Sequence, residues 1–253
     1  MLELVHTAHQ PATKLYVGLA RDAAEVREAQ RLRYRVFAEE LGARLTPREA
    51  GVDRDYYDAF CEQLVVRDEE SGRLIGAYRL LAPEAARRAG SYYSETEFNI
   101  DRLRHLRDRT VEVGRACIDA DYRTGGTIAL LWSGIIRYML QHRHEYLIGC
   151  ASIGMADGGR SAAGIFQSLA AHMAPLEYRA FPTCPLPLDR IEARHDVEVP
   201  ALIKGYLRAG AYVCGNPAWD PDFNTADLMM LLPMRRISPR YARHFVERQE
   251  GRR

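Results

Sequence analysis

The sequence lacks the features that would place it in several large classes of protein. None of its five cysteines forms a C-x-x-C pair with another, which argues against a zinc site or a thioredoxin-like motif. The longest apolar stretches, such as Ile128 to Trp132, are far shorter than the ~20 residues of a membrane-spanning helix. Neither sign of charge dominates, since 35 Lys and Arg residues stand against 34 Asp and Glu residues. No overall field therefore favours nucleic acid as a partner.

Targeting and linker segments are missing as well. The N-terminus from Met1 to Lys14 has no long apolar run of the kind that a signal peptide contains, and the number of cysteines is odd. Both features predict a protein of the reducing cytoplasm. No internal repeat or low-complexity linker interrupts the 253 residues, so we expect one domain over residues 1–253.

Hydrophobic periodicity predicts a mixed α/β fold. The predicted strands are Lys14–Leu19, Cys61–Arg67, Arg73–Leu81, Thr110–Ile118, Tyr146–Ile153, Glu177–Phe181, Tyr212–Gly215 and Leu228–Met234. The predicted helices are Asp22–Leu41, Thr127–Gln141, Ser161–Met173 and Pro200–Ala209. A hairpin joins two of the early strands, so we expect a mostly antiparallel sheet with one β-helix-β unit. A doubly wound dinucleotide fold fits this order poorly.

A segment with two glycines, residues 121–128 (DYRTGGTI), joins a predicted strand to a predicted helix. Glycines at a helix N-terminus leave backbone N–H groups free to hold a phosphate, and the helix dipole favours the anion. The alternative is a plain helix cap whose glycines allow close packing. The segment matches neither the G-x-x-x-x-G-K-S/T nor the G-x-G-x-x-G nucleotide motif. The residues predicted to bind phosphate are Arg123, Thr124, Gly125, Gly126 and Thr127.

The preceding strand contains Glu112 and Arg115 in the sequence EVGR. In a regular strand these two side chains point to opposite faces, because the side-chain period is two. A β-bulge at Gly114 would bring both to one buried face, where we expect them to pair. The alternatives are two side chains on opposite faces or an ordinary surface ion pair.

Several of these residues together resemble enzymes of the GCN5-related N-acetyltransferase (GNAT) superfamily. The segment at Arg123 and Gly126 is similar to the R-x-x-G-x-G/A loop that binds the phosphates of coenzyme A or of a carrier protein's phosphopantetheine, with Ile128 where that family prefers a small residue. The positions that resemble the acyl-homoserine-lactone autoinducer synthases are Arg33, Phe37, Asp55, Asp58, Arg79, Glu112 and Arg115. Arg33 and Phe37 are four apart, so they share a helix face. Ala43 stands where those synthases carry a tryptophan near the S-adenosylmethionine site.

The C-terminal part resembles a second group. Residues 200–211 (PALIKGYLRAGA) and 215–227 (GNPAWDPDFNTAD) resemble the C-terminal signature of the ornithine N-acyltransferases of the hemolysin-like group, which make lyso-ornithine lipid. This resemblance extends from about Leu15 to Phe245. A loop packed by Trp219 and Phe223 is the alternative for the second segment. The resemblance implies a GNAT-like α/β fold with a core of about 14–182 and a C-terminal elaboration of about 183–253.

The resemblance implies transfer of a long-chain 3-hydroxyacyl group from acyl carrier protein to the α-amine of an amino acid, with ornithine expected. The carrier's phosphopantetheine is then a co-substrate, and no metal or further cofactor is expected. We expect Glu112 to remove the amine proton, directly or through water, and the strand at Gly114 to direct a backbone N–H at the thioester carbonyl. Arg33, Arg79 and Arg115 are expected to hold loops and carboxylates in place. One of these arginines is expected to bind the α-carboxylate of the substrate. The candidates for neutralising the side-chain ammonium are Asp55, Asp58, Asp222 and Asp227.

Two other functions stay open at this point. One is an autoinducer synthase, which would need S-adenosylmethionine, or another long-chain N-acyl amino acid synthase. The other is a non-catalytic module that binds acyl carriers or membranes. The arginines of Asp101–Arg109 are a candidate surface for an acidic carrier protein, or a solvated segment. The tail Arg240–Arg253 either adsorbs to the inner face of the cytoplasmic membrane or docks on the domain.

Overall fold

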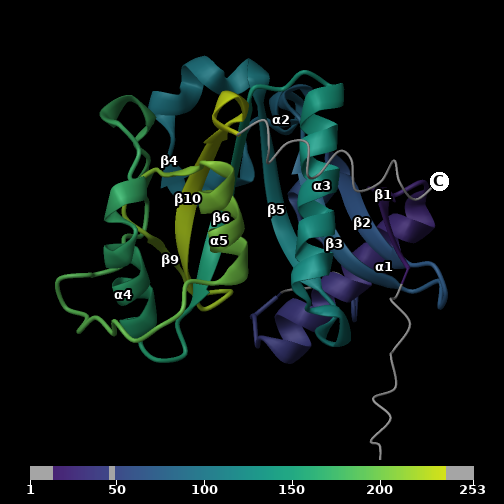
Figure 1. Cartoon of the computed structure of the whole chain (residues 1–253), viewed down its shortest axis with the longest axis horizontal. Coiled ribbons are helices and arrows are strands. Elements are labelled where there is room, and N and C mark those ends of the chain that lie inside the picture. The colour runs from purple at the N-terminus through teal and green to yellow at the C-terminus, as the bar shows by residue number, and fades with distance from the viewer. Residues whose placement is uncertain (1–13, 46–48, 238–253) are drawn as a thin grey trace, which may run out of the picture.

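The computed structural model describes residues 14–45 and 49–237. Within them, the strands of one sheet follow the order β1-β2-β3-β5-β6-β10-β8, and β9 also pairs with β10 (Figure 1). These strands are β1 (Leu15–Leu19), β2 (Glu62–Asp68), β3 (Leu74–Leu81), β5 (Thr110–Ile118), β6 (Tyr146–Gly154), β8 (Tyr212–Val213), β9 (Ala218–Asp220) and β10 (Thr225–Pro233). The neighbours are antiparallel except β5 and β6, which are parallel. The predicted sheet with one β-helix-β unit is therefore confirmed.

The helices follow the sequence pattern with some changes at their ends. They are α1 (Ala23–Tyr34), α2 (Pro83–Ala89), α3 (Gly125–Gln141), α4 (Arg160–Ser168) and α5 (Ala201–Ala209). Asp22 caps α1, because its carboxylate accepts a hydrogen bond from the N–H of Glu25 at 2.9 Å. After Tyr34 the helix widens into a π-helical turn, Arg35–Glu40, so the single helix predicted over Asp22–Leu41 is two segments.

Short elements fill the stretches between these helices and strands. A strand predicted over Glu177–Phe181 is wrong, because Leu176–Tyr178 is a 3₁₀ turn. It is followed by β7 (Phe181–Pro182), which pairs with β4 (Phe98–Asn99). The other 3₁₀ turns are Tyr56–Ala59, Tyr93–Thr96, Asp101–Arg109, Ala120–Tyr122, Ala170–His172 and Met234–Arg236.

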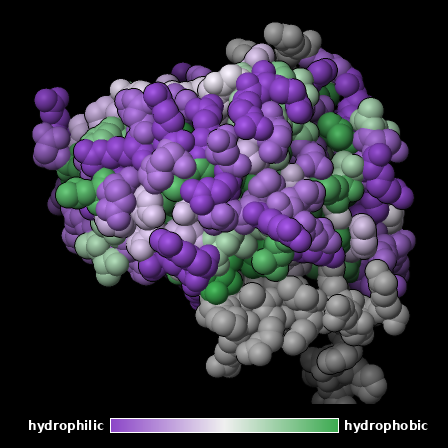
Figure 2. All heavy atoms as spheres, turned by 90° about the horizontal axis from the view of Figure 1, so that it is seen from above, coloured by the Kyte–Doolittle hydropathy of each residue, from purple (hydrophilic) through white to green (hydrophobic). Residues whose placement is uncertain are grey.

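The surface agrees with the balanced composition. The face drawn in Figure 2 is mostly hydrophilic, with hydrophobic residues in small groups. Among the described residues, the large hydrophobic side chains that are exposed are Tyr16, Leu19, Leu41, Tyr56, Leu140, Leu176, Phe181 and Trp219. No helix in the described part of the chain is long and apolar enough to cross a membrane.

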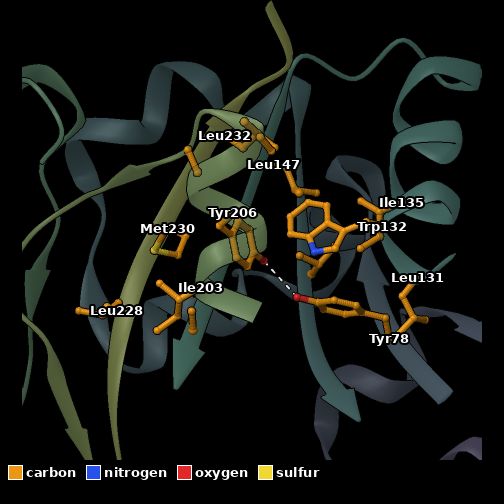
Figure 3. Close-up of a cluster of buried hydrophobic side chains, with 14 of the residues drawn as sticks. Tyr78, Leu131, Trp132, Ile135, Leu147, Ile203, Tyr206, Leu228, Met230 and Leu232 are labelled. Atoms are coloured by element: carbon orange, nitrogen blue, oxygen red, sulfur yellow. Dashed lines mark hydrogen bonds between the residues drawn. The ribbon is translucent and has the colours of Figure 1, made fainter. Parts of the chain in front are cut away.

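The larger core lies between the sheet and the helices α3 and α5 (Figure 3). Trp132 of α3 meets Tyr206 of α5 edge to face, with ring centroids 4.8 Å apart. The hydroxyl of Tyr206 lies 3.1 Å from that of Tyr78 on β3, so both buried hydroxyls have a partner. A Cβ atom on Gly205 would lie 2.6 Å from Trp132 Nε1, so α5 approaches α3 this closely because residue 205 has no side chain. On the opposite face, Leu32 and its neighbours on α1 pack against β2, β3 and β5.

The C-terminal segment is part of the main sheet. β10 pairs with β6 along nine positions, from Thr225 opposite Gly154 to Pro233 opposite Tyr146. Residues after about 183, predicted as an elaboration of a core ending near 182, thus supply β8, β9 and β10. Pairing between strands more than 70 residues apart has no signature in local periodicity, so the sequence did not reveal this arrangement.

Candidate active site

Arg33 forms the centre of a buried ion-pair network. This side chain is 0% exposed. Its Nε donates to Asp53 Oδ2 at 2.8 Å, while Nη1 and Nη2 donate to the two oxygens of Asp58 at 2.5 and 3.0 Å. This bidentate geometry matches the planar fork of a guanidinium to a carboxylate. A charge removed from water in this way is tolerated because it is paired on both sides.

Arg79 and Arg115 extend the network from the sheet. Arg79 Nη1 donates to Asp55 Oδ1 at 2.6 Å and to Asp58 Oδ2 at 3.3 Å. Arg115 Nη2 reaches Asp55 Oδ2 at 3.3 Å, and its Nε lies 3.5 Å from Asp53 Oδ2. Three arginines thus balance three aspartates and hold residues 53–58 against the sheet. The sequence indicated five of these six residues and missed Asp53. Asp53 could have been found because it lies in the same polar segment as Asp55 and Asp58.

β5 carries the bulge predicted at Gly114. Arg79 faces Gly114 and Ala77 faces Cys117, so β5 has one residue more than β3 over this stretch. Arg115 takes a φ of +55°, a conformation that is uncommon for a residue with a side chain. The extra residue brings the side chain of Arg115 to the same cavity as that of Glu112.

Glu112 nevertheless does not pair with Arg115, and this part of the prediction is wrong. Its carboxylate accepts hydrogen bonds from the N–H of Tyr93 at 2.6 Å, from the N–H of Ser94 at 2.7 Å and from the Ser94 hydroxyl. These donors belong to a 3₁₀ turn whose first N–H groups have no partner within the turn. Burial raises the pKa of Glu112, although the hydrogen bonds from Ser94 and Tyr93 oppose the shift.

The parallel strands β5 and β6 separate beside Glu112. Their pairing covers Thr110 to Glu112 on β5 and ends there, whereas β5 stays paired with β3 as far as Ile118. The backbones of β5 and β6 are in close contact where the strands begin to diverge. A Cβ atom on Gly149 of β6 would lie only 2.4 Å from the carbonyl oxygen of Val113 on β5. From Val113 onward, the β6 side of β5 faces no strand within the described residues. A gap of this kind exposes backbone polar groups to a ligand.

A cavity of about 230 Å³ lies at this divergence. Its lining includes Tyr78, Val113 and Leu202 from the side of α3 and α5, and Glu112 and Asp227 from the opposite face of the sheet. The cavity is therefore lined from both faces of the sheet. The predicted site residues that line the cavity are Phe37, Arg79, Glu112, Gly114, Arg115 and Asp227.

Other predicted residues lie outside the cavity lining. Arg33, Asp55 and Asp58 are engaged in the ion-pair network, and Asp222 is exposed in the turn between β9 and β10. The cavity also contains polar residues that the sequence did not indicate. They are Tyr57, Tyr93, Glu97, Cys150, Ser152 and Asp220. These come from four separate segments, and no local pattern brings them together.

The predicted phosphate loop begins α3. Thr124 is the N-cap, with its hydroxyl oxygen 3.4 Å from the N–H of Thr127. Within the described chain, the N–H groups of Gly125 and Gly126 meet no acceptor, and a Cβ atom on Gly125 would meet nothing within 4 Å. The guanidinium of Arg123, just before these amides in the chain, is paired with both carboxylate oxygens of Glu40, and its Nη2 donates to Oε2 at 2.6 Å. The loop thus offers free amides at a helix N-terminus next to an arginine that is already paired.

The arginine-rich segment Asp101–Arg109 lies far from this loop. It is a 3₁₀ helix that ends where β5 begins, whereas the loop follows the end of β5. A strand of nine residues spans about 30 Å. Several of its arginines are already paired within the protein, Arg104 with Asp101 and Arg109 with Glu145. Carrier docking at this segment stays a prediction, as does membrane contact by Arg240–Arg253, which lies outside the described residues.

Comparison with known proteins identifies the fold class of this chain. A model of the acetyltransferase (GNAT) domain family matches residues 32–133. A solved CoA-dependent acyl-homoserine lactone synthase superposes with a TM-score of 0.55 at 14% identity, covering 94% of this chain and 89% of that chain. An N-acyl amino acid synthase from uncultured soil microbes gives a TM-score of 0.51 at 12% identity, covering 88% and 93%. The protein thus has the GNAT fold.

The family follows from similarity along almost the whole chain. An L-ornithine N(alpha)-acyltransferase from Rhizobium meliloti (strain 1021) is 37% identical over 251 residues, covering 91% of this chain and 84% of that protein. Its counterpart from Rhodobacter capsulatus is 36% identical over 253 residues, covering 93% and 96%. The chain belongs to the L-ornithine N(alpha)-acyltransferase family.

Proposed function

We propose that this protein transfers a long-chain 3-hydroxyacyl group from acyl carrier protein to the α-amine of ornithine, which gives lyso-ornithine lipid. The observation that carries the proposal is the cavity at the divergence of β5 and β6, which is lined from both faces of the sheet and contains Glu112. The names of the full-length relatives support the acceptor and the reaction. The free amides at Gly125 and Gly126 support a donor that carries a phosphate.

The reaction joins the α-nitrogen of ornithine to the acyl carbon. An ammonium has no lone pair, so Glu112 takes a proton from it, directly or through water, before or during attack. The new C–N bond forms as the carbonyl oxygen becomes negatively charged, and an N–H of the bulged strand at Gly114 stabilises that charge. The C–S bond then breaks as the nitrogen gives up its second proton, which ends on the pantetheine thiolate, while the first proton passes from Glu112 to solvent. The products are the N-acyl amino acid and the free carrier thiol.

The direct test incubates purified protein with 3-hydroxyacyl carrier protein and ornithine. We expect release of the carrier thiol and a product whose mass is that of ornithine plus the 3-hydroxy fatty acid minus water. A coenzyme A thioester in a parallel reaction tests whether the carrier protein is the donor. Acylation of S-adenosylmethionine with formation of a homoserine lactone would identify an autoinducer synthase instead. Carrier binding without thioester turnover would identify a non-catalytic module.

Arg123→Ala is expected to raise the KM for the acyl carrier protein by about tenfold while the KM for ornithine changes little. The reason is that Arg123 and the amides of Gly125 and Gly126 lie at the N-terminus of α3, where a phosphate is favoured. Steady-state kinetics with each substrate varied in turn measures both constants. Arg190→Ala removes an exposed arginine elsewhere and serves as the control. A change confined to the KM for ornithine would assign the loop to the acceptor instead.

A further inference from the structure

Three carboxylates converge in the cavity from different parts of the chain. Glu97 lies between the turn Tyr93–Thr96 and β4, Asp220 ends β9, and Asp227 lies in β10. One oxygen atom of each lies within 4.8 Å of one oxygen of the other two. All three side chains line the same cavity as Glu112. The cavity is therefore strongly acidic at one place.

No cation of the described chain neutralises this cluster. Neither Glu97, Asp220 nor Asp227 forms an ion pair with a described Lys, Arg or His. Asp227 is 3% exposed, and its Oδ1 has no hydrogen-bond partner; Glu97 Oε2 is likewise buried without one. Burial, with the nearby negative charge of the other carboxylates, raises the pKa of Glu97 and of Asp227. Buried carboxylates without a partner are costly, so an incoming cation would be bound favourably.

The cavity is also lined by two arginines, Arg79 and Arg115. The guanidinium of Arg115 lies over the rings of Tyr93 and Phe223, at 4.8 and 4.5 Å from their centroids. Its Nε is buried and makes no hydrogen bond. A cavity lined by both a guanidinium and a carboxylate cluster suits a molecule that carries a carboxylate and a separate ammonium. An α-amino acid with a terminal amine has this arrangement.

We propose that Glu97, Asp220 and Asp227 form the subsite for the side-chain ammonium of the acceptor and select amino acids with a terminal amine. The proposal rests on the function proposed above and chooses Asp227 among the four aspartates that the sequence left open. An ammonium has three N–H donors, and the cluster offers one acceptor oxygen from each of three residues. A hard divalent cation would prefer about six oxygen ligands. With its side chain held here, the acceptor presents its α-amine near Glu112.

The test compares ornithine with norvaline, which has the same carbon chain without the terminal amine. We expect wild-type kcat/KM to favour ornithine by about a hundredfold. Asp227→Asn and Glu97→Gln should each raise the KM for ornithine about tenfold or more, leave kcat within a few-fold and leave kcat/KM for norvaline unchanged or raised. Asp222→Asn is the matched comparison, since Asp222 lies in the adjoining turn but is exposed and outside the cavity. It should keep the wild-type preference.

The outcomes separate this inference from the proposed function. If wild-type protein acylates no amino acid, the proposed function fails, and titration calorimetry with ornithine and Mg²⁺, without donor, still tests the cluster. The inference is overturned if wild type acylates both amino acids equally, or if folded Asp227→Asn and Glu97→Gln proteins keep the preference. The inference is also overturned if the activity requires Mg²⁺ and the Asp227→Asn substitution abolishes Mg²⁺ binding. A collapse of kcat with both amino acids in Glu97→Gln would make Glu97 a base rather than a selectivity residue. Circular dichroism establishes that each variant is folded.

Discussion

Glu112→Gln is expected to lower kcat for acyl transfer by about a hundredfold or more, because an amide cannot accept the proton of the attacking amine. The side chain is suited to this role by its position. It is 4% exposed, lines the cavity where β5 and β6 diverge, and has a pKa raised by burial. A raised pKa makes a carboxylate a stronger base near neutral pH. Single-turnover measurements with a saturating acyl donor would report the chemical step itself.

The pH dependence distinguishes a base from a structural carboxylate. In wild type, kcat should fall as the pH drops through a value above the ordinary pKa of glutamic acid, about 4.3, because protonated Glu112 cannot act. In Glu112→Gln the residual rate should lose this acidic limb. Ser94→Ala is the control, since it removes one hydrogen bond to the carboxylate and keeps the base. A folded Glu112→Gln protein with near-normal turnover would assign the residue to holding the turn Tyr93–Thr96.

Arg33→Met is expected to cost about 3–5 kcal/mol of folding stability, because the buried negative charges of the aspartates lose the positive charge of the arginine. Asp53 would keep only the longer contact from Arg115, at 3.5 Å, and Asp58 would lose its bidentate partner. For a chain of this size, each 1 kcal/mol corresponds to about 2–4 °C in Tm, so a loss of about 10 °C is expected. Thermal unfolding followed by circular dichroism measures it. Arg104→Ala, which removes an exposed ion pair with Asp101, should leave Tm almost unchanged.

Acid should weaken the same network. Against the desolvation caused by its burial, hydrogen bonds and charge from Arg33 hold the pKa of Asp58 well below its usual range. A carboxylate with a lowered folded-state pKa contributes stability that is complete above its ordinary pKa of about 3.9 and is lost as the pH falls below it. The stability difference between wild type and Arg33→Met should therefore shrink below about pH 4. An unchanged Tm in Arg33→Met at neutral pH would show that Asp53 and Asp58 tolerate burial without this arginine.

The amino-acid sequence determined the order of the elements and much of the ion-pair network. Periodicity of two and of 3.6 is a local property, so the hairpin, α3 and the single parallel pair could be predicted from it. The bulge at Gly114 was also predictable, since glycine permits it and the spacing of Glu112 and Arg115 requires it for a shared face. The network residues Arg33, Asp55, Asp58 and Arg79 were indicated by their types and by the family that the chain resembles.

Tertiary structure alone decided the partners of these residues and the composition of the cavity. Glu112 accepts hydrogen bonds from Tyr93 and Ser94 rather than from Arg115, because the tertiary fold places the unsatisfied N–H groups of a 3₁₀ turn beside it. Glu97 and Asp227 are 130 residues apart in the chain, and their carboxylates converge although Glu97 follows the turn Tyr93–Thr96 and Asp227 lies in β10, opposite Ser152 of β6. Contacts at such separations depend on strand order and register, which no local spacing encodes. The acidic cluster could therefore be recognised only once the sheet was assembled.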